Sequence, residues 1–579
     1  MNRRMCFGLV FLLVACWASD GSCRAEQDGM APFNPVQPHY DWRAQDYPRN
    51  TAVEAVHFDT DRGRLVADGR FDGRSEDNAK GEIYIDFRCI PEFECGLPVD
   101  LSETTVKVLL EVPEGFAGEE QTPSGIQIFG KCEGEDEPSQ YSSWRNISLW
   151  KHEDVIEIQH RFSTAEPKYG FMSPGFDPRR MIKIGVKFAM GGGSKHSYKG
   201  PVYVNQVSFD PPIMLPARPV LDPLAPVLET SQRLAVKTGA LCVGDRQVFL
   251  LGANWRPTGY GCFGRTKWFP LGNGPSKYPN YLEYYMRMAR SAGMEVLRIG
   301  VVDDGQALFS SKDEVVGYDD VFRQDIRTCV ELARKHGIRI EWVLIDFLAA
   351  GKARPAKGVQ AQGHARVFTD PAVRGEFISK FLVPFLKEFG TAPAIAIDIM
   401  NEPEWIVSKQ EFCTGSPCGG WEDVKDPNTK AERAIPRSNF TDFANACIKA
   451  IREHAPGILV TCGVSCINAS LIEGLDLDYR AFHYYKWMGE RSTVLGALPK
   501  DKPWVLEEFP TVGPAGQVEY DIAGYAQAAR KAGGSGAYIW NLSCGIDDMT
   551  FCCCERAAKL SRLREWAALK SRQSLLPQQ

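Results

Sequence analysis

The chain has 579 residues, of which 44% are hydrophobic and 24% charged, and its formal net charge is −6. One ordinary hydrophobic core does not grow to this length, so two large domains are expected. The acidic balance, without a basic stripe that carries interleaved aromatic residues, argues against nucleic acid and against an anionic membrane surface as partners.

The N-terminus has the pattern of an export signal. Two arginines precede an apolar stretch at 6–14, which is too short to span a bilayer, and no other segment approaches about 20 apolar residues. We therefore expect residues 1–25 to be a signal peptide and the protein to be secreted, periplasmic or attached to the cell surface. The tetrapeptide LVAC ending at Cys16 resembles a bacterial lipobox, which would place a lipid anchor there. Cleavage after Ala18 or Ala25 is the alternative.

Eighteen cysteines occur in the chain, three of them in the export segment. Disulfides are plausible in an oxidising compartment, and the run 552–554 near Cys544 could hold one or two. Buried free thiols are the alternative. No pair of CxxC knuckles and no added His pair at zinc-binding spacing occurs, so we expect no metal site. The pairs that lie close in sequence are Cys89/Cys95, Cys413/Cys418 and Cys462/Cys466.

The first half of the chain has the pattern of an all-β domain. Residues 26–50 are polar and rich in proline, which predicts a tether. From 51 to 210, short segments alternate between apolar and polar residues and are separated by turn signals, as in β-strands. No helical pattern interrupts them, so a β-sandwich of jelly-roll type is expected. The clearest strands are 105–111, 125–129, 154–160, 181–188 and 201–209.

A proline-rich stretch marks the domain boundary. Six prolines fall within residues 210–227, and such a composition favours an extended, semi-rigid spacer. We therefore assign 211–235 as a linker and 236–579 as the second domain.

The second domain alternates short apolar runs with helix-periodic segments. Near-continuous apolar strands are buried on both faces, as in a parallel sheet. Eight such βα units predict a (β/α)₈ barrel, so the chain is of the α/β class with an all-β domain before it. The predicted strands are 248–254, 296–302, 338–346, 394–401, 457–462, 479–485, 503–509 and 536–541. The predicted helices are 280–292, 318–336, 371–389, 437–454, 522–532 and 557–569.

Two of these strands end in carboxylates. In a (β/α)₈ barrel, catalytic groups lie at the C-terminal ends of the strands. Strand four ends at Glu402, and strand seven ends at Glu507 and Glu508. A charge at the end of a buried strand costs free energy unless it is paired or solvated in a cleft. Two carboxylates that face one cleft suit cleavage of a glycosidic bond, and a separation of about 5–5.5 Å gives retention of configuration.

The motifs at these strand ends resemble those of the clan A glycoside hydrolases, and of family 5, the cellulase and mannanase family, in particular. Asn-Glu-Pro at 401–403 and Glu508-Phe509 match that pattern. The resemblance covers residues 240–570. Each motif is weak alone, but six occur in the family's order, each at a strand end.

The resemblance implies roles for the matching residues. Glu402 would be the general acid and then the general base, and Glu508 the nucleophile. Arg298 would hold Glu508 ionised and oriented together with Tyr485, and Asn401 would contact the sugar 2-hydroxyl.

Two further positions match. His483 belongs to a His-x-Tyr motif on strand six, and Trp540 would form the floor of the subsite that holds the ring under attack. The family's chemistry needs no cofactor.

The sequence departs from the family in two places. Leu348 stands where the family has a histidine in Asp-x-His, which puts one contact to the outer hydroxyls of the substrate in doubt. Glu507 precedes Glu508 where glycine is more usual, and it is a rival nucleophile. We favour Glu508, because the family glutamate directly precedes phenylalanine. Since neighbouring strand residues point to opposite sides, we expect only one of them in the cleft.

Other residues near the strand ends carry no assigned role. Asp303, Asp304 and Lys486 are expected to be surface charges. Each of five tryptophans could line a subsite or pack in a core or loop, namely Trp255, Trp268, Trp405, Trp421 and Trp487.

The segment 100–209 loosely resembles jelly-roll carbohydrate-binding modules. Four aromatic residues could stack on sugar rings or pack in the core of the domain, namely Tyr141, Trp144, Trp150 and Tyr169.

Together these features predict a retaining glycoside hydrolase that cleaves a polysaccharide or oligosaccharide of β-mannan or β-glucan type by double displacement. The long loops 255–277, 348–370 and 404–436 could form a cleft or close it into a pocket. An exo-acting β-glycosidase on short oligosaccharides is therefore an alternative, and so is a catalytically inactive barrel that only binds glycan.

Overall fold

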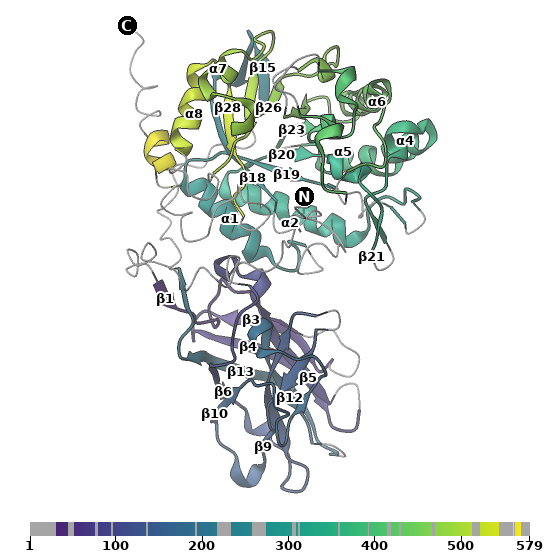
Figure 1. Ribbon diagram of the computed structural model, residues 1–579. Coiled ribbons are helices and arrows are strands. Elements are labelled where there is room, and N and C mark those ends of the chain that lie inside the picture. The colour runs from purple at the N-terminus through teal and green to yellow at the C-terminus, as the bar shows by residue number, and fades with distance from the viewer. Residues whose placement is uncertain are drawn as a thin grey trace, which may run out of the picture.

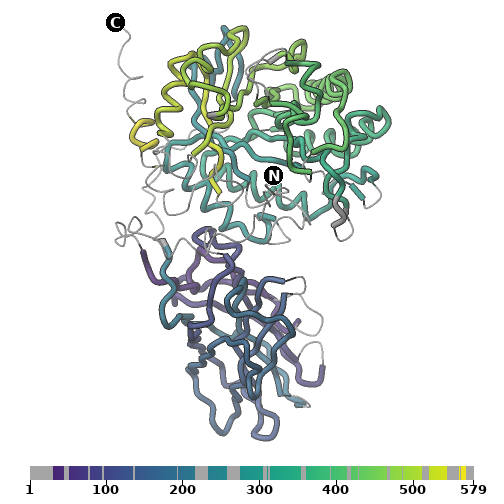
Figure 2. Tube along the Cα trace, viewed as in Figure 1, coloured from purple at the N-terminus to yellow at the C-terminus, as the bar shows by residue number. Residues whose placement is uncertain are grey.

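The computed structural model shows a sandwich of strands and a separate barrel of strands and helices (Figure 1). In the chain trace, purple to blue residues form the sandwich and teal to yellow residues form the barrel (Figure 2). The described residues are 30–44, 51–75, 79–93, 97–134, 137–191, 194–216, 233–256, 274–303, 309–310, 313–356, 359–391, 393–413, 419–427, 430–465, 469–511, 521–543, 560 and 562–568. The predicted signal peptide, Cys16 and most of the proline-rich linker lie outside them.

Two antiparallel sheets form the N-terminal domain, as predicted. One has the order β10 (Val155–Arg161), β6 (Thr105–Glu111), β13 (Ser197–Asp210), β4 (Arg64–Asp72) and β3 (Val53–Asp59). The other has the order β11 (Phe171–Met172), β8 (Ser139–Tyr141), β7 (Ser124–Cys132), β12 (Met181–Ala189), β5 (Lys80–Asp86) and β2 (Arg43–Ala44), with β9 (Arg145–Ile147) beside β7. Alternate residues of β6 are buried, and Val106, Val108 and Leu110 pack with Ile83 and Ile85 of the opposite sheet.

Residues 30–44 differ from the expected tether. β1 (Met30–Pro32) pairs with β14 (Met214–Pro216), and β2 pairs with β5. Phe33, Val36 and Trp42 are buried in the core of the sandwich. Three apolar side chains in an otherwise polar stretch therefore attach it to the domain, because their burial removes apolar surface from water.

A closed parallel barrel forms the second domain. Its strand order is β24-β23-β20-β19-β18-β28-β27-β26-β25, and only Cys462 separates β24 from β25, so the ring is complete. All eight predicted strands are confirmed. The strands are β18 (Leu250–Trp255), β19 (Val296–Gly300), β20 (Arg339–Val343), β23 (Ala394–Asp398), β24 (Leu459–Thr461), β25 (Gly463–Val464), β26 (Arg480–His483), β27 (Trp504–Glu508) and β28 (Gly536–Ile539).

Helices surround this ring (Figure 1). Asp319 caps α2 by accepting a hydrogen bond from the Phe322 amide at 2.9 Å, and Gly337 ends the helix with a left-handed φ of 62°. A π-helical turn at Ile378–Leu382 interrupts the predicted helix 371–389, because Pro384 has no N–H to donate to the preceding turn. The helices are α1 (Pro279–Ser291), α2 (Asp320–His336), α3 (Arg366–Thr369), α4 (Pro371–Phe377), α5 (Val383–Phe389), α6 (Arg437–His454), α7 (Arg491–Gly496) and α8 (Ile522–Lys531).

The two domains touch at the start of α1. Asn280 donates a hydrogen bond to Asp41 at 2.8 Å. Tyr278 shares a side-chain hydrogen bond with Tyr84 of β5, and the Arg43 guanidinium lies 5.4 Å from the centre of the Tyr278 ring. The sandwich and the barrel are thus joined by polar and aromatic contacts as well as by the linker.

Two of the suggested disulfides are wrong. Cys89 and Cys462 are buried free thiols, each packed in the hydrophobic core, whereas Cys413 is disulfide-bonded. The cysteines 544 and 552–554 lie outside the described residues. No helix in the described part of the chain is long and apolar enough to cross a membrane.

A small hairpin covers the interior residues of the barrel strands. It consists of β15 (Leu234–Lys237), β16 (Ala240–Val243) and β17 (Arg246–Gln247). Leu241 is fully buried there in one cluster with Leu250 and Val505 of the barrel strands.

We expect Leu241→Ala to lower the free energy of unfolding by about 2–5 kcal/mol, because it leaves a cavity under the barrel. Denaturant titration of both variants measures this, with Val236→Ala as the control, since Val236 is 37% exposed on the same hairpin. Equal midpoints for the two variants would contradict the packing described for the hairpin.

Candidate active site

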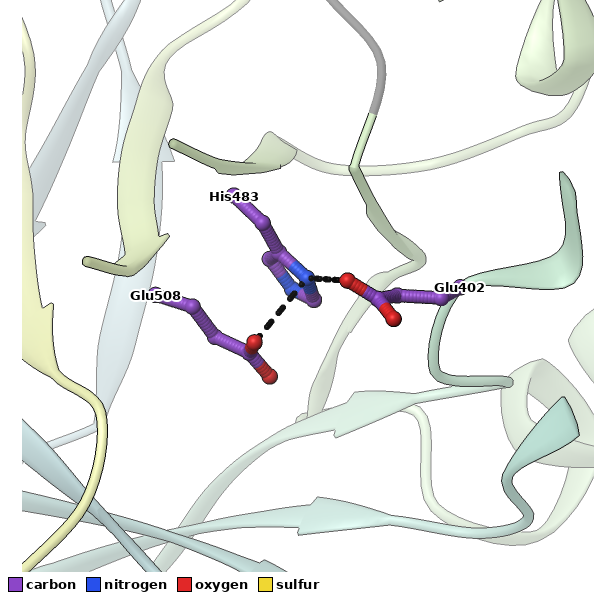
Figure 3. Close-up of side chains that lie close together, drawn as sticks. All are labelled: Glu402, His483 and Glu508. Carbon is purple, nitrogen blue, oxygen red and sulfur yellow. Dashed lines mark hydrogen bonds and ion pairs between the residues drawn. The ribbon is translucent and has the colours of Figure 1, made fainter. Parts of the chain in front are cut away.

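Side chains from three barrel strands meet at the C-terminal end of the barrel. His483 ends β26 and lies between Glu402, which follows β23, and Glu508, which ends β27 (Figure 3). His483 Nδ1 is 2.7 Å from Glu402 Oε1 and 3.3 Å from Glu508 Oε2. The two carboxylates predicted to act together are therefore brought to the same imidazole.

Glu402 is held in an uncommon backbone conformation. Its φ is 48°, in the left-handed region that few non-glycine residues adopt. Its amide donates to the Gly463 carbonyl at 2.8 Å, and its Oε2 accepts a hydrogen bond from Trp405 Nε1 at 2.7 Å. Backbone outliers of this kind cost free energy and cluster at functional sites. Here the outlier accompanies a carboxylate held from both oxygens.

Glu508 is buried and held by two donors. Arg298 Nη1 donates to its Oε1 at 2.7 Å, and the Tyr485 hydroxyl donates to its Oε2 at 2.6 Å. Burial raises the pKa of Glu508 above its ordinary value, while His483 and Arg298 oppose that rise. The predicted bracing contacts are both present.

Arg298 is completely buried and joins the other groups of the site. Besides Glu508, its guanidinium donates to Asn254 at 2.8 Å, to Asp398 at 2.5 Å and to Asn401 at 2.6 Å. Burial would lower the pKa of Arg298, but the surrounding carboxylates raise it well above its usual value. A permanent cation therefore fixes the orientation of groups from several strands.

Glu507 also lies inside the barrel, contrary to the expected alternation. The register between β26 and β27 shifts at this point, so that Phe482 pairs with Leu506 but His483 pairs with Glu508. Such a bulge leaves one residue unpaired and re-aims the neighbouring side chain. Glu507 and Glu508 therefore both contact Arg298 and His483.

The Glu507 carboxylate occupies a different position from that of Glu508. Its Oε2 lies 3.2 Å from Arg298 Nε and 3.3 Å from His483 Nε2. Burial alone would raise the pKa of Glu507, but Arg298 and hydrogen bonds to neighbouring side chains lower it to about 2. A Cβ at Gly463 would come within 2.5 Å of this carboxylate, so a glycine is required there.

A third carboxyl lies behind Glu507. Glu341 accepts hydrogen bonds from the hydroxyls of Tyr479 at 2.8 Å and Tyr538 at 3.3 Å. Burial and the neighbouring Glu507 raise the pKa of Glu341 well above its ordinary value. The pKa values of these two neighbouring carboxyls are therefore shifted in opposite directions.

His483 is surrounded by carboxylates. Burial alone would lower its pKa, but Glu508 and the hydrogen bonds to Glu402 and Glu507 raise it to about 10. Both ring nitrogens then carry protons at neutral pH, and each faces a carboxylate oxygen. A fixed positive charge therefore lies between Glu402 and Glu508.

Asn401 connects this centre to a second charged group. Its Oδ1 accepts from Arg298, and its Nδ2 donates to Asp346 at 2.7 Å. Arg256 Nη1 lies 3.2 Å from the same Asp346 oxygen and 3.1 Å from Asp303. Asp303 is 1% exposed, so the expectation of a surface charge is wrong for it.

The pKa values in this second group rise. Burial raises the pKa of Asp346 to about 7, although Arg256 opposes the rise. Burial likewise raises the pKa of Asp303. Trp540 lies beside the group, with its ring centre 5.6 Å from the Arg256 guanidinium carbon.

The other aromatic residues have different environments. Trp255 is fully buried in the core, Trp421 is half-buried, Trp487 is 52% exposed, and Trp268 lies outside the described residues. Of these tryptophans, Trp405 hydrogen-bonds a predicted catalytic residue, Glu402. In the sandwich, Trp150 and Tyr169 are the most exposed of the four suggested rings, Trp144 is 41% exposed, and Tyr141 stacks on Phe129.

Glu402, His483 and Glu508 offer ligand atoms within 4.8 Å of one another, close enough to surround a cation. Metal binding needs a neutral imidazole, whereas the pKa of His483 is about 10. The Arg298 guanidinium already occupies one oxygen of Glu508. At neutral pH the three groups fit a hydrogen-bonded network better than a metal site.

Several site residues were not predicted. Asn254, Arg256 and Asp398 lie within or directly after apolar strands, and each bonds a buried charge. A polar residue in a buried strand needs a partner, and that was the available signal. Glu404 was not predicted as a site residue either. Burial and the charge of the neighbouring Glu402 raise its pKa to about 8.

Comparisons with known proteins find similarity in the barrel. An endo-1,4-β-mannanase from Eisenia fetida is 24% identical, with a TM-score of 0.45, over 57% of this chain and 95% of that one. A β-mannanase from Mytilus edulis is 21% identical, with a TM-score of 0.44, over 58% and 97%. A β-1,4-mannanase from Aplysia kurodai is 20% identical, with a TM-score of 0.43, over 57% and 96%. No protein-family model and no curated protein sequence matches the chain.

We expect Glu507→Gln to lower the pKa of His483, because it removes one of the negative charges that hold the imidazolium. A raised histidine pKa contributes stability below pH 6.5, and this contribution is lost as pH rises through about 10. In the variant the loss begins at a lower pH. Ring ¹⁵N NMR shifts against pH measure the change, with His483→Gln to assign the signal.

The matched control is Glu453→Gln, because Glu453 lies on α6 with an exposed side chain. The same His483 titration in Glu507→Gln as in wild type would show that Glu507 does not hold the imidazolium.

Proposed function

We propose that the protein is a retaining glycoside hydrolase that cleaves β-linked glycans of mannan or glucan type by double displacement. The observation that carries this proposal is the spacing of two carboxylates. Glu402 and Glu508 each offer an oxygen within 4.8 Å of the other, which supports the short carboxyl separation of about 5–5.5 Å typical of retention over the separation of about 6.5–9.5 Å typical of inversion.

In the first step Glu508 attacks the anomeric carbon while Glu402 gives its proton to the departing glycosidic oxygen. A covalent glycosyl ester forms on Glu508, and the bond to the leaving sugar breaks. Arg298 and Tyr485 hold the attacking carboxylate in one orientation, which avoids reorganisation during the reaction.

In the second step Glu402, now ionised, takes a proton from water, whose oxygen attacks the same carbon. The ester breaks, and Glu508 returns to its carboxylate form. His483 Nδ1 lies 2.7 Å from Glu402 Oε1 and helps to orient this carboxylate. Trp405 donates to the other oxygen of Glu402 and keeps the carboxylate aimed through both steps.

Asn401 and Trp540 supply the proposed contacts to the sugar. Arg298 and Asp346 hold the Asn401 amide from both ends, so its orientation is fixed before substrate enters. A contact to the 2-hydroxyl from this position strengthens as charge develops at the anomeric carbon. The Trp540 ring would lie under the sugar.

We expect Glu402→Ala and Glu508→Ala each to lower kcat/KM by about 10⁴-fold or more on the glycan that the wild type cleaves, because each removes a group that forms or breaks a bond. New reducing ends from β-mannan, β-glucan and xylan measure this. Glu388→Ala, on α5, is the control. A wild type that binds glycan without cleaving it would favour the inactive barrel.

The stereochemistry has its own test. Proton NMR during the first turnovers should show the β-anomer of the new reducing end before mutarotation. An α-anomer at that stage would exclude double displacement at Glu508, whatever the activities of the variants.

We also expect EDTA dialysis to leave the rate unchanged, because Arg298 and His483 supply the positive charge that a metal would otherwise provide. Activity before and after chelation, with zinc and calcium added back, measures this. A loss that either metal restores would contradict the assignment of Glu402, His483 and Glu508 to a hydrogen-bonded network.

A further inference from the structure

Two buried charged side chains beside the catalytic centre have polar atoms without hydrogen-bond partners. Arg256 follows β18, Asp303 follows β19, and each is 1% exposed. Among the described residues, Nε and Nη2 of Arg256 and both carboxylate oxygens of Asp303 have no hydrogen-bond partner, although Asp303 Oδ2 lies 3.1 Å from Arg256 Nη1 as an ion pair. Buried polar atoms without partners destabilise a fold, so they call for an explanation such as a bound ligand.

The backbone around the pair is built to hold it. A Cβ at Gly300 would collide with the Asp303 carboxylate, so only glycine leaves room for it. The Arg256 carbonyl accepts hydrogen bonds from Asn541 at 2.8 Å and from Ser543 at 2.6 Å. The surroundings therefore hold this pair in place, while Nε and Nη2 of Arg256 and the Asp303 oxygens make no hydrogen bond.

A chain of side-chain contacts connects Arg256 to the reacting centre. Asn401 bonds Asp346, and Asp346 contacts Arg256, which lies beside Trp540. If Asn401 faces the 2-hydroxyl of a sugar on Trp540, the next hydroxyls round the ring lie toward Asp346 and Arg256. A guanidinium with two free N–H groups can bond two adjacent oxygens at once, and a free carboxylate can accept from a hydroxyl.

We propose that Arg256 and Asp303 form a binding subsite for neighbouring neutral hydroxyls of the sugar ring that rests on Trp540, on the side away from the anomeric carbon. This proposal rests on the proposed hydrolase function. It also accounts for Leu348, where the resembling family has a histidine, because strands one and two supply the outer-hydroxyl contacts in its place.

The local charge selects a neutral sugar over an acidic one. Asp303 and Asp346 lie 3.1 and 3.2 Å from the single guanidinium group of Arg256. At a pH above the raised pKa values of Asp303 and Asp346, the carboxylate of a uronic acid would meet both ionised aspartates at close range, and like charges at that distance repel. Hydroxyls can donate to Asp303 and accept from Arg256 without adding charge.

The test is calorimetric titration in the Glu508→Ala background, where the first step cannot occur. The probes are β-1,4-mannohexaose, cellohexaose and a mannuronate hexamer. We expect Arg256→Met and the isosteric Asp303→Asn each to weaken the Kd of the better neutral hexasaccharide about 10-fold or more. Arg256→Met removes the N–H donors, and Asp303→Asn replaces one charged acceptor oxygen by an NH₂ group that cannot accept.

Arg339→Met is the matched control. Arg339 is also 1% exposed and also has an unbonded Nε, but it lies at the first residue of β20, at the opposite end of the barrel. It should change Kd less than 2-fold, and thermal melts of all variants check that they fold.

Each outcome bears on one proposal. An unchanged Kd in both Arg256→Met and Asp303→Asn overturns the subsite. A failure of both neutral probes to bind overturns it as well. Tighter binding of the mannuronate hexamer than of the neutral probes overturns the preference for neutral sugars. A protein that retains Glu508 could bind the hexasaccharide and cleave nothing, while Arg256→Met weakens that binding. This result contradicts the hydrolase function but supports the subsite.

Discussion

The Arg298 guanidinium, which has no exposed surface, holds the mouth of the barrel together. It bonds Asn254, Asp398, Asn401 and Glu508, which come from three different strands or strand ends. Burying a cation is costly, and it is tolerated only when its partners are well aligned. The partners in turn are carboxylates and amides that would be equally costly without the cation. The strand ends are thus fixed relative to one another before any substrate arrives, because the buried cation and its partners each require the other.

This arrangement explains which parts of the molecule could be predicted from the sequence. The barrel strands are near-continuous apolar runs, and all eight were found because such runs have few other uses. Glu402 and Glu508 were predicted as site residues because they end those runs, and Arg298 because it matches a motif of the resembling family. The inward position of Glu507 was missed, since a register shift between two strands leaves no trace in the alternation of one. Asp303 was misplaced because its partner, Arg256, lies on another strand.

The same reasoning applies outside the barrel. Residues 30–44 look like a tether in composition, yet Phe33, Val36 and Trp42 hold them on the sandwich. Sequence spacing suggested disulfides at Cys89 and Cys462, whereas both thiols are buried in the core. Short spacing makes a pair possible, but the direction of each Cβ decides it. In each case the three-dimensional neighbours decide the outcome.

The bulge in β27 lets two consecutive residues of this strand place their side chains in the barrel interior. Val505 and Glu507 face the interior in ordinary alternation, and Glu508 then joins them without an intervening outward residue. Single-residue insertions or deletions usually ruin a barrel strand, because they turn every later side chain over. At this point the strand already accommodates an extra residue. Since glycine is more usual before the nucleophile in the resembling family, a single substitution at position 507 adds a third interior carboxylate and leaves the nucleophile and every later residue in place.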